Sequence, residues 1–257
     1  MNLQNKVVVI TGGASGLGQA AARYLVNEKQ ARVALLDLNE EAGQATVSEL
    51  GENNALFCQA DVTSEESVDA AIAAVMEKFS AIHGNINAAG VPMPCKVLDK
   101  EGKASGLSKY AKVISINLCG VFNVMAKCVE QMAKNSLEED ERGVVVNVSS
   151  GAAFEGQIGQ AAYSASKAGV NGMNIPVARE LGGLGIRINS IAPGLFATPL
   201  IKGLDKKVQD SLVQMVEAPK RMGEPEEFAE ACAFLMESAY MNGRVLRFDA
   251  ATILQSK

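Results

Sequence analysis

The chain has 257 residues, with 24 basic and 29 acidic side chains and a formal net charge of -5. This length suits a single α/β domain, and the acidic balance argues against a dedicated nucleic-acid-binding protein, so we expect no nucleic-acid partner. The five cysteines are far apart without a C-x-x-C pair and His83 is the one histidine, so we predict neither a disulfide framework nor a metal site.

At the N-terminus, Met1 is followed almost directly by an apolar run at residues 6–10, and no run of 18 apolar residues appears in the sequence. Such a start differs from the charged and then apolar leader of a secretory signal. We therefore expect a cytoplasmic protein that has no membrane partner. A mitochondrial matrix location stays open if a presequence has been removed.

Short apolar runs rich in β-branched residues alternate with longer helical patterns along the chain. The runs predict seven strands, at residues 7–10, 32–37, 55–60, 82–88, 143–148, 186–192 and 245–249. Helices are predicted at residues 16–29, 64–79, 107–134, 160–181 and 225–237. Such repetition predicts an α/β fold with one doubly wound parallel sheet, covered by helices on both faces, in a single Rossmann-like domain over residues 1–257.

Two stretches depart from this regular pattern. The fourth predicted strand contains Gly84 and Asn85, which are poor strand residues, so we expect it to be held weakly by its neighbours. Residues 193–222 form a long excursion after the carboxyl end of a predicted strand, which is where open α/β sheets bind ligands. We expect this excursion to be functional or mobile.

A glycine-rich turn, T-G-G-A-S-G-L-G at residues 11–18, joins the first predicted strand to an amphipathic helix. Glycines there permit close approach to a pyrophosphate, while the helix N-terminus supplies N–H groups and a positive dipole end. The second strand ends on Asp37, which is placed to accept hydrogen bonds from an adenosine ribose 2'-hydroxyl, although it could also be a helix cap. Because no cation for a 2'-phosphate stands beside Asp37, the pattern favours NAD over NADP.

Tyr163 and Lys167 are four residues apart and share one face of a predicted helix. Bringing a tyrosine pKa from ~10 to about 7 requires roughly 4 kcal/mol of phenolate stabilisation, which the Lys167 ammonium and a cationic nicotinamide could jointly supply. Ser150 would steady a substrate oxygen as charge develops on it. The competing interpretations are a chance Tyr-x-x-x-Lys pair and a strand-end cap at Ser150.

These motifs together resemble the short-chain dehydrogenase/reductase family over essentially the whole chain. The resemblance implies reversible hydride transfer between NAD and a secondary alcohol, with a cofactor half at about residues 1–150 and a catalytic and substrate half at about 151–257. It implies that Tyr163 exchanges the proton, that Lys167 also binds the nicotinamide ribose, and that Asn117 holds a relay water. The implied catalytic residues are Asn117, Ser150, Tyr163 and Lys167. The implied cofactor-binding residues are Gly12, Ser15, Gly16, Leu17, Gly18, Asp37, Asp61, Val62, Asn87, Ala88, Gly90, Tyr163, Lys167, Pro193, Phe196 and Thr198.

Residues 152–163 and 191–200 are similar to the type II 3-hydroxyacyl-CoA dehydrogenase branch of this family, which also oxidises some hydroxysteroids. The resemblance implies an acyl-CoA or hydroxysteroid substrate. Its candidate contacts are Ser150, Gln157, Gln160, Tyr163 and Leu200. Five apolar residues of the excursion are predicted to form a lid over the substrate, or equally to fill space under the loop: Leu195, Phe196, Leu200, Ile201 and Leu204. Four lysines are candidate contacts for the CoA phosphates, or else exposed residues that only increase solubility: Lys96, Lys100, Lys103 and Lys202.

Other classes stay open. A reductase of ketoacyl thioesters on a carrier protein, or another short-chain alcohol dehydrogenase, would share the fold and the catalytic residues, and the former would prefer NADPH, against which Asp37 argues. A non-catalytic scaffold would lose the chemistry, yet Ser150, Tyr163 and Lys167 are all present. The resemblance also implies a homotetramer.

One departure from the family is the pair Asp249-Ala250, where the family usually has Asp-Gly. If that turn needs a positive φ, the alanine would cost stability.

Overall fold

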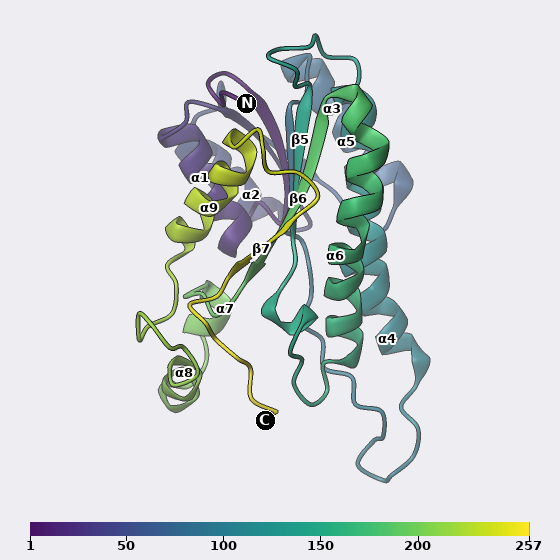
Figure 1. The fold of residues 1–257 in the computed structure, drawn as a ribbon, viewed down its shortest axis with the longest axis vertical. Helices are drawn as coiled ribbons and strands as arrows, with labels where there is room; N and C mark the ends of the chain where they lie inside the picture. Colours follow the sequence, from purple (N-terminus) through teal and green to yellow (C-terminus); the bar gives the residue numbers. More distant parts are fainter. Residues whose placement is uncertain (257) are drawn as a thin grey trace.

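A seven-stranded parallel sheet forms the centre of the computed structural model, which describes residues 1–256 without the side chain of Leu200 (Figure 1). Its strand order is β3-β2-β1-β4-β5-β6-β7. The strands are β1 (Val7–Thr11), β2 (Arg32–Asp37), β3 (Ala55–Gln59), β4 (Gly84–Asn87), β5 (Gly143–Val148), β6 (Ile186–Pro193) and β7 (Val245–Phe248). The predicted doubly wound α/β sheet of seven strands is confirmed.

Helices cover the sheet in two layers, because its central strands are apolar on both faces. One layer consists of α1 (Gly16–Asn27), α2 (Glu40–Leu50) and α9 (Pro225–Glu237). The other consists of α3 (Glu65–Phe79), α5 (Gly120–Met132) and α6 (Ala161–Leu181). The remaining helical elements are α4 (Leu107–Ile114), η1 (Ser115–Cys119), η2 (Gly151–Ala153), η3 (Gly182–Leu184), α7 (Pro199–Lys202) and α8 (Lys206–Val213).

The fourth strand pairs along its whole length with β1 and β5, although it begins two residues later than predicted. Gly84 leaves room for the side chain of Met236 in α9, since a Cβ on Gly84 would lie 2.4 Å from Cε of Met236. Asn85 is buried, and its side-chain amide donates to the Val9 carbonyl at 3.2 Å. Both residues that are poor in an isolated strand therefore have a specific partner or neighbour in this sheet.

Arg187 of β6 ties the sheet to the end of α9. Its buried guanidinium pairs with Glu141 and donates to the carbonyls of Leu235 at 2.9 Å, Met236 at 2.6 Å and Met241 at 2.9 Å. Burial alone would raise the pKa of Glu141, but Arg187 and the amino terminus hold that pKa below its usual value. This cluster satisfies the carbonyls at a helix C-terminus, which have no partner within the helix.

The turn after β7 does need positive φ. Ala250 has φ of 49° and Ala251 has φ of 54°, a region that costs an L-residue roughly 1–2 kcal/mol. The turn therefore does require a positive φ at Ala250, where we expected a loss of stability, and Ala251 has a positive φ as well.

The predicted helix at residues 107–134 is a continuous stretch of α4, η1 and α5. Its segment Leu107–Met132 is long and apolar enough to cross a membrane by length and composition alone. One such helix is weak support for a membrane span, because a core helix of a globular protein passes the same test. The absence of a membrane partner stays a prediction.

Candidate active site

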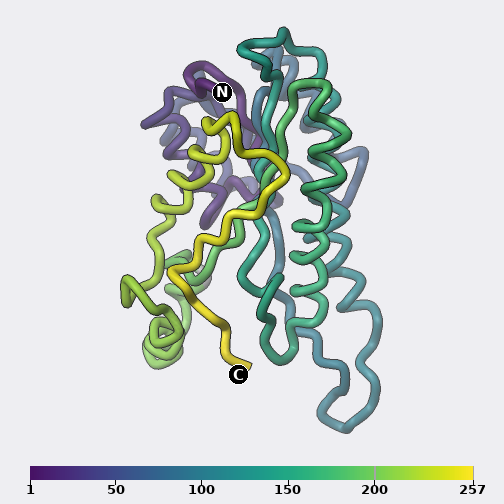
Figure 2. The backbone as a smooth tube through the Cα atoms, in the orientation of Figure 1, coloured from purple at the N-terminus to yellow at the C-terminus, as the bar shows by residue number. Residues whose placement is uncertain are grey.

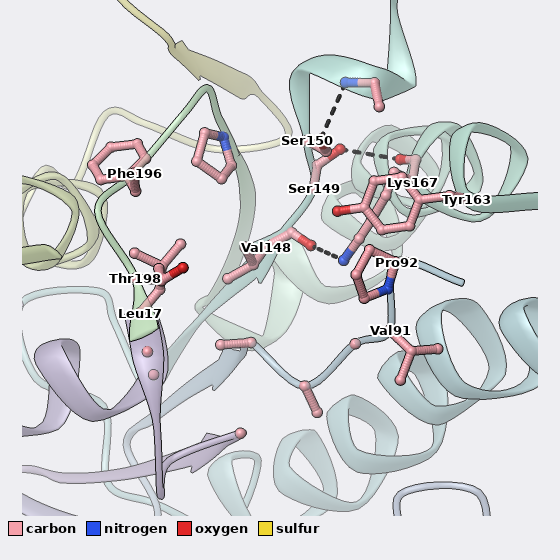
Figure 3. Close-up of a pocket in the computed structure, with 18 of the residues that line it drawn as sticks. Leu17, Val91, Pro92, Val148, Ser149, Ser150, Tyr163, Lys167, Phe196 and Thr198 are labelled. Atoms are coloured by element: carbon pink, nitrogen blue, oxygen red, sulfur yellow. Dashed lines mark hydrogen bonds between the residues drawn. The ribbon is translucent and has the colours of Figure 1, made fainter. Parts of the chain in front are cut away.

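A cavity of about 1090 Å³ lies at the carboxyl ends of the strands, where a doubly wound sheet binds ligands. The glycine-rich turn and the ends of β2 and β3 line one part of it. Ser150, Tyr163 and Lys167 line another part, and residues of the 193–222 excursion close a third side (Figure 3). The structure therefore brings the predicted cofactor and catalytic motifs into one site.

The glycine-rich turn is packed so tightly at Gly12 and Gly18 that a side chain cannot replace either glycine. Gly12 has φ of 66°, and a Cβ on it would lie 3.0 Å from the Ala89 nitrogen. A Cβ on Gly18 would lie 2.3 Å from the Gly12 oxygen. Gly16 also has a positive φ, and Ser15 is the N-cap of α1 without a side-chain cap bond. The turn thus presents the uncapped N-terminus of α1 to the cavity, as a pyrophosphate site requires.

Asp37 is held in a fixed orientation at the end of β2. Its carboxylate accepts the N–H of Ala14 at 3.1 Å and the N–H of Asn39 at 3.1 Å. Asn39, rather than Asp37, is the side-chain cap of α2, accepting the N–H of Ala42. The alternative interpretation of Asp37 as a helix cap is therefore not supported, and its carboxylate lines the cavity.

Asp61, Val62, Ala88 and Gly90 line the same side of the cavity, as predicted, whereas Asn87 is not among the lining residues. The Asn87 side chain is buried within the sheet. Its amide donates to Oδ1 of Asn85 at 2.6 Å and to Oδ1 of Asn147 at 2.9 Å. The side chain of Asn87 therefore holds neighbouring strands together, and a contact of Asn87 with the cofactor stays a prediction.

The side chains of Ser150, Tyr163 and Lys167 converge where β5 ends and α6 begins (Figure 3). Lys167 is buried, and its Nζ donates to the Val148 carbonyl at 2.8 Å and lies 5.8 Å from the centre of the Tyr163 ring. The Ser150 hydroxyl accepts the N–H of Ala152 at 3.1 Å. Ser150 therefore does cap η2.

Burial shifts the pKa of both the Tyr163 and the Lys167 side chain. Burial raises the pKa of Tyr163, and the Ser150 hydroxyl opposes that rise. Burial also lowers the pKa of Lys167 to about 8. The lowering of the Tyr163 pKa by Lys167 and a bound nicotinamide together stays a prediction.

Asn117 lies in η1, a π-helical turn of the kind often found at functional sites. It is buried and is not among the residues that line the cavity. Its amide donates to the Val91 carbonyl at 3.1 Å and to the Ser166 hydroxyl at 3.2 Å, and its Oδ1 accepts the Val91 N–H at 2.9 Å. Asn117 thus anchors the loop after β4, while its role in holding a relay water stays a prediction.

Most of the predicted substrate residues lie along the cavity. Gln157 and Gln160 line it, and the Gln157 N–H donates to Oε1 of Gln160 at 2.9 Å. Phe196 also lines the cavity. Its ring is largely buried, with the ring centroids of Phe228 and Phe248 both 6.0 Å away, so it is a packed part of the cavity wall. Leu195, Ile201 and Leu204 line the cavity as predicted, together with Pro193 and Thr198. The side chain of Leu200 lies outside the described residues.

Several residues that line the cavity were not predicted from the sequence, among them Lys112, Val208, Leu212, Thr252 and Leu254. An i, i+4 apolar spacing along α8 could have indicated the second and third of these. The candidate lysines 96, 100, 103 and 202 are all exposed and do not line the cavity.

Comparison with known proteins agrees with this geometry. The family model described as short chain dehydrogenase matches residues 6–209. The chain belongs to the short-chain dehydrogenase family. This short-chain dehydrogenase is 44% identical to the 3-hydroxyacyl-CoA dehydrogenase type-2 of Homo sapiens over 99% of this chain and 97% of the human protein. It is 43% identical to the Drosophila melanogaster protein of the same name, over 97% of this chain and 98% of that protein.

The fold of this short-chain dehydrogenase is also similar to a solved structure. The crystal structure of 3-hydroxyacyl-CoA dehydrogenase type-2 from Mycobacterium avium matches with a TM-score of 0.91 and 38% identity, covering 98% of this chain and 97% of that one. The protein is therefore an oxidoreductase of a family that uses NAD(P), and it has a site for a small-molecule substrate.

Proposed function

We propose that this short-chain dehydrogenase oxidises 3-hydroxyacyl-CoA esters to 3-ketoacyl-CoA esters with NAD. The observation that carries the proposal is the convergence of Ser150, Tyr163 and Lys167 in a single cavity with the glycine-rich turn. The names of the similar proteins supply the substrate class. The apolar side of the cavity, which includes Leu195, Ile201 and Leu204, suits an acyl chain and also a steroid skeleton.

The cavity fits a dinucleotide. Its backbone cradle at Gly12 and Gly18 has no room for a Cβ, and the α1 N-terminus faces the position that a pyrophosphate would take. Asp37 would bind the adenosine ribose, and its charge supports NAD rather than NADP because a 2'-phosphate would repel it. When bound, NAD accepts a hydride at its nicotinamide ring and returns it in the reverse reaction.

The side chains of the protein supply the proton chemistry. Tyr163 takes the proton of the substrate hydroxyl during oxidation and returns it during reduction. Lys167, which is held by the Val148 carbonyl, favours the phenolate and binds the nicotinamide ribose. Ser150, which lines the cavity together with Tyr163, orients the substrate oxygen beside the phenol.

We further propose that the protein is a homotetramer located in the cytoplasm. Large apolar side chains on the outer helices support the assembly. Phe122 of α5 is 54% exposed and Ile175 of α6 is 39% exposed, while Phe234 of α9 is 52% exposed on the opposite layer. Exposed apolar side chains on both helix layers would allow two kinds of two-fold contact, which together would close a tetramer. A stable monomer in sedimentation at micromolar concentration would refute the tetramer.

A panel of substrates tests the proposed reaction. NADH absorbance is followed with 3-hydroxybutyryl-CoA, with 3-hydroxybutyrate and with a hydroxysteroid, each in the presence of NAD. We expect the thioester to react far better than the free acid, because the similar proteins are named for acyl-CoA substrates. Activity on the free acid alone would contradict the thioester proposal. A preference for NADPH and a carrier-protein thioester would favour the ketoacyl reductase alternative.

A further inference from the structure

The C-terminal segment, residues 249–256, forms one side of the catalytic cavity. After β7 it runs between the α7–α8 excursion and the chain that precedes α6 (Figures 1 and 2). Thr252 and Leu254 of this segment line the cavity. Nothing in the proton chemistry or in the cofactor cradle requires these residues, so their contribution concerns the substrate.

Hydrogen bonds attach the segment to both neighbouring walls. On the α8 side, the N–H of Glu217 donates to the Ala250 carbonyl at 3.2 Å. On the catalytic side, the N–H of Ile158 donates to the Ser256 carbonyl at 3.1 Å, and Nε2 of Gln157 donates to the Gln255 carbonyl at 3.0 Å. The segment therefore spans the cavity from one wall to the other.

A charged cluster at the end of β7 fixes where the segment begins. The Arg247 guanidinium forms a two-pronged pair with Glu155, at 2.9 and 3.1 Å, and contacts Asp249 at 2.6 Å. It also lies 4.8 Å from the centre of the Phe154 ring. An isolated exposed ion pair contributes little to stability, but a two-pronged pair between planar groups also fixes their relative orientation. Arg247 thus joins the segment to the loop between Ser150 and Tyr163.

We propose that this segment determines substrate specificity, that Leu254 limits the length of the acyl chain, and that Arg247 is a positioning residue that holds the segment in place. The proposal rests on the proposed function, because an acyl chain is the ligand that Leu254 would meet. Leu254 is half-buried and lines the cavity. Its neighbour Ile253 is 66% exposed and does not line it, so side chains of the same size have opposite placements.

That difference supplies a matched control. The values of kcat/KM for 3-hydroxyacyl-CoA esters, from butyryl to hexadecanoyl, are compared between the wild type, Leu254→Ala and Ile253→Ala. Truncation at Leu254 removes three carbons, and each additional substrate methylene that it accommodates raises kcat/KM about fourfold. We expect the preferred chain to lengthen by roughly two to three carbons in Leu254→Ala, and to stay unchanged in Ile253→Ala.

An unchanged preference in Leu254→Ala, or an equal shift in Ile253→Ala, would overturn this inference while leaving the proposed function intact. A wild-type protein that oxidises no 3-hydroxyacyl-CoA would overturn both. The two failures are therefore distinguishable.

The positioning role of Arg247 has its own readout. In Arg247→Met, KM for the longest accepted substrate should rise roughly tenfold or more, the loss of about two methylene contacts, while kcat with the shortest substrate and the affinity for NAD remain near wild type. A uniform fall in kcat at all chain lengths with unchanged KM would contradict the assignment. If Arg247→Met does not fold, Glu155→Ala breaks only the contact with the loop, and the same split between KM and kcat decides the question.

Discussion

Replacing Asp37 with alanine should remove most of the preference for NAD. The carboxylate is already oriented by the N–H groups of Ala14 and Asn39, both at 3.1 Å, so it can bind a ribose hydroxyl without further ordering. A hydrogen bond to a charged group contributes about 1.5–3 kcal/mol. Losing it should weaken NAD binding roughly 10- to 100-fold.

The same carboxylate would repel a 2'-phosphate. Two unit charges about 4 Å apart at a protein surface interact by roughly 4 kcal/mol before salt screening, and we take about half of this value for the half-exposed Asp37. Asp37→Ala should therefore improve NADP binding roughly 30-fold. Both effects together reduce the ratio of the two affinities about 1000-fold.

Fluorescence titration with NADH and NADPH measures both affinities directly. Glu40→Ala is the matched control, because Glu40 is exposed in the first turn of α2, does not line the cavity and carries the same charge. Equal affinities of the wild type for the two cofactors, or the same change in Glu40→Ala as in Asp37→Ala, would refute the reasoning.

Three further predictions concern stability. Burial lowers the folded-state pKa of Lys167 to about 8, so above that pH the unfolded chain binds more protons than the folded protein. The contribution of Lys167 to stability should therefore rise by roughly 2 kcal/mol between about pH 8 and 9.5. Urea unfolding that gives the same pH profile for Lys167→Met would contradict this. Arg187→Met should destabilise the fold by about 3–5 kcal/mol, because it leaves three carbonyls without their donor and the Glu141 carboxylate with the amino terminus as its remaining partner. A loss below about 1 kcal/mol in urea would show that the cluster is unimportant. Changing Ala250 and Ala251 together to glycine should relieve the positive-φ cost and raise the melting temperature by a few degrees; a lower melting temperature would show that chain entropy outweighs the strain.

The order of strands and helices could be predicted because apolar runs and turn residues are local signals. The glycine-rich turn, Asp37 and the Tyr163–Lys167 pair could be placed for the same reason, since each depends on spacing within one element or on one strand end. The helix α2 is not among the helices predicted from the sequence. It contains Gly43, where a Cβ would lie 2.1 Å from the Phe57 ring, so a glycine that weakens the helical pattern is required by packing against the sheet.

Side-chain direction was harder to predict than position. Asn87 ends the strand β4, yet its side chain enters a buried asparagine cluster and does not line the cavity. A difference of one residue in register reverses the face of a strand residue. The position of Leu254 at the cavity could not be predicted from the sequence, because the residues that hold the end of its segment, Gln157 and Ile158, are about a hundred positions earlier.

The most direct test of the central claim is the rate of hydride transfer in Tyr163→Phe, measured as NADH formation from 3-hydroxybutyryl-CoA. The substitution removes only the hydroxyl, and Tyr240→Phe is the matched control because Tyr240 is fully exposed. We predict that Tyr163→Phe lowers turnover by at least about 100-fold, the scale of general acid-base groups, while NAD affinity and the rate of Tyr240→Phe remain those of the wild type. A Tyr163→Phe protein that keeps wild-type turnover would contradict the assignment of proton transfer to this site.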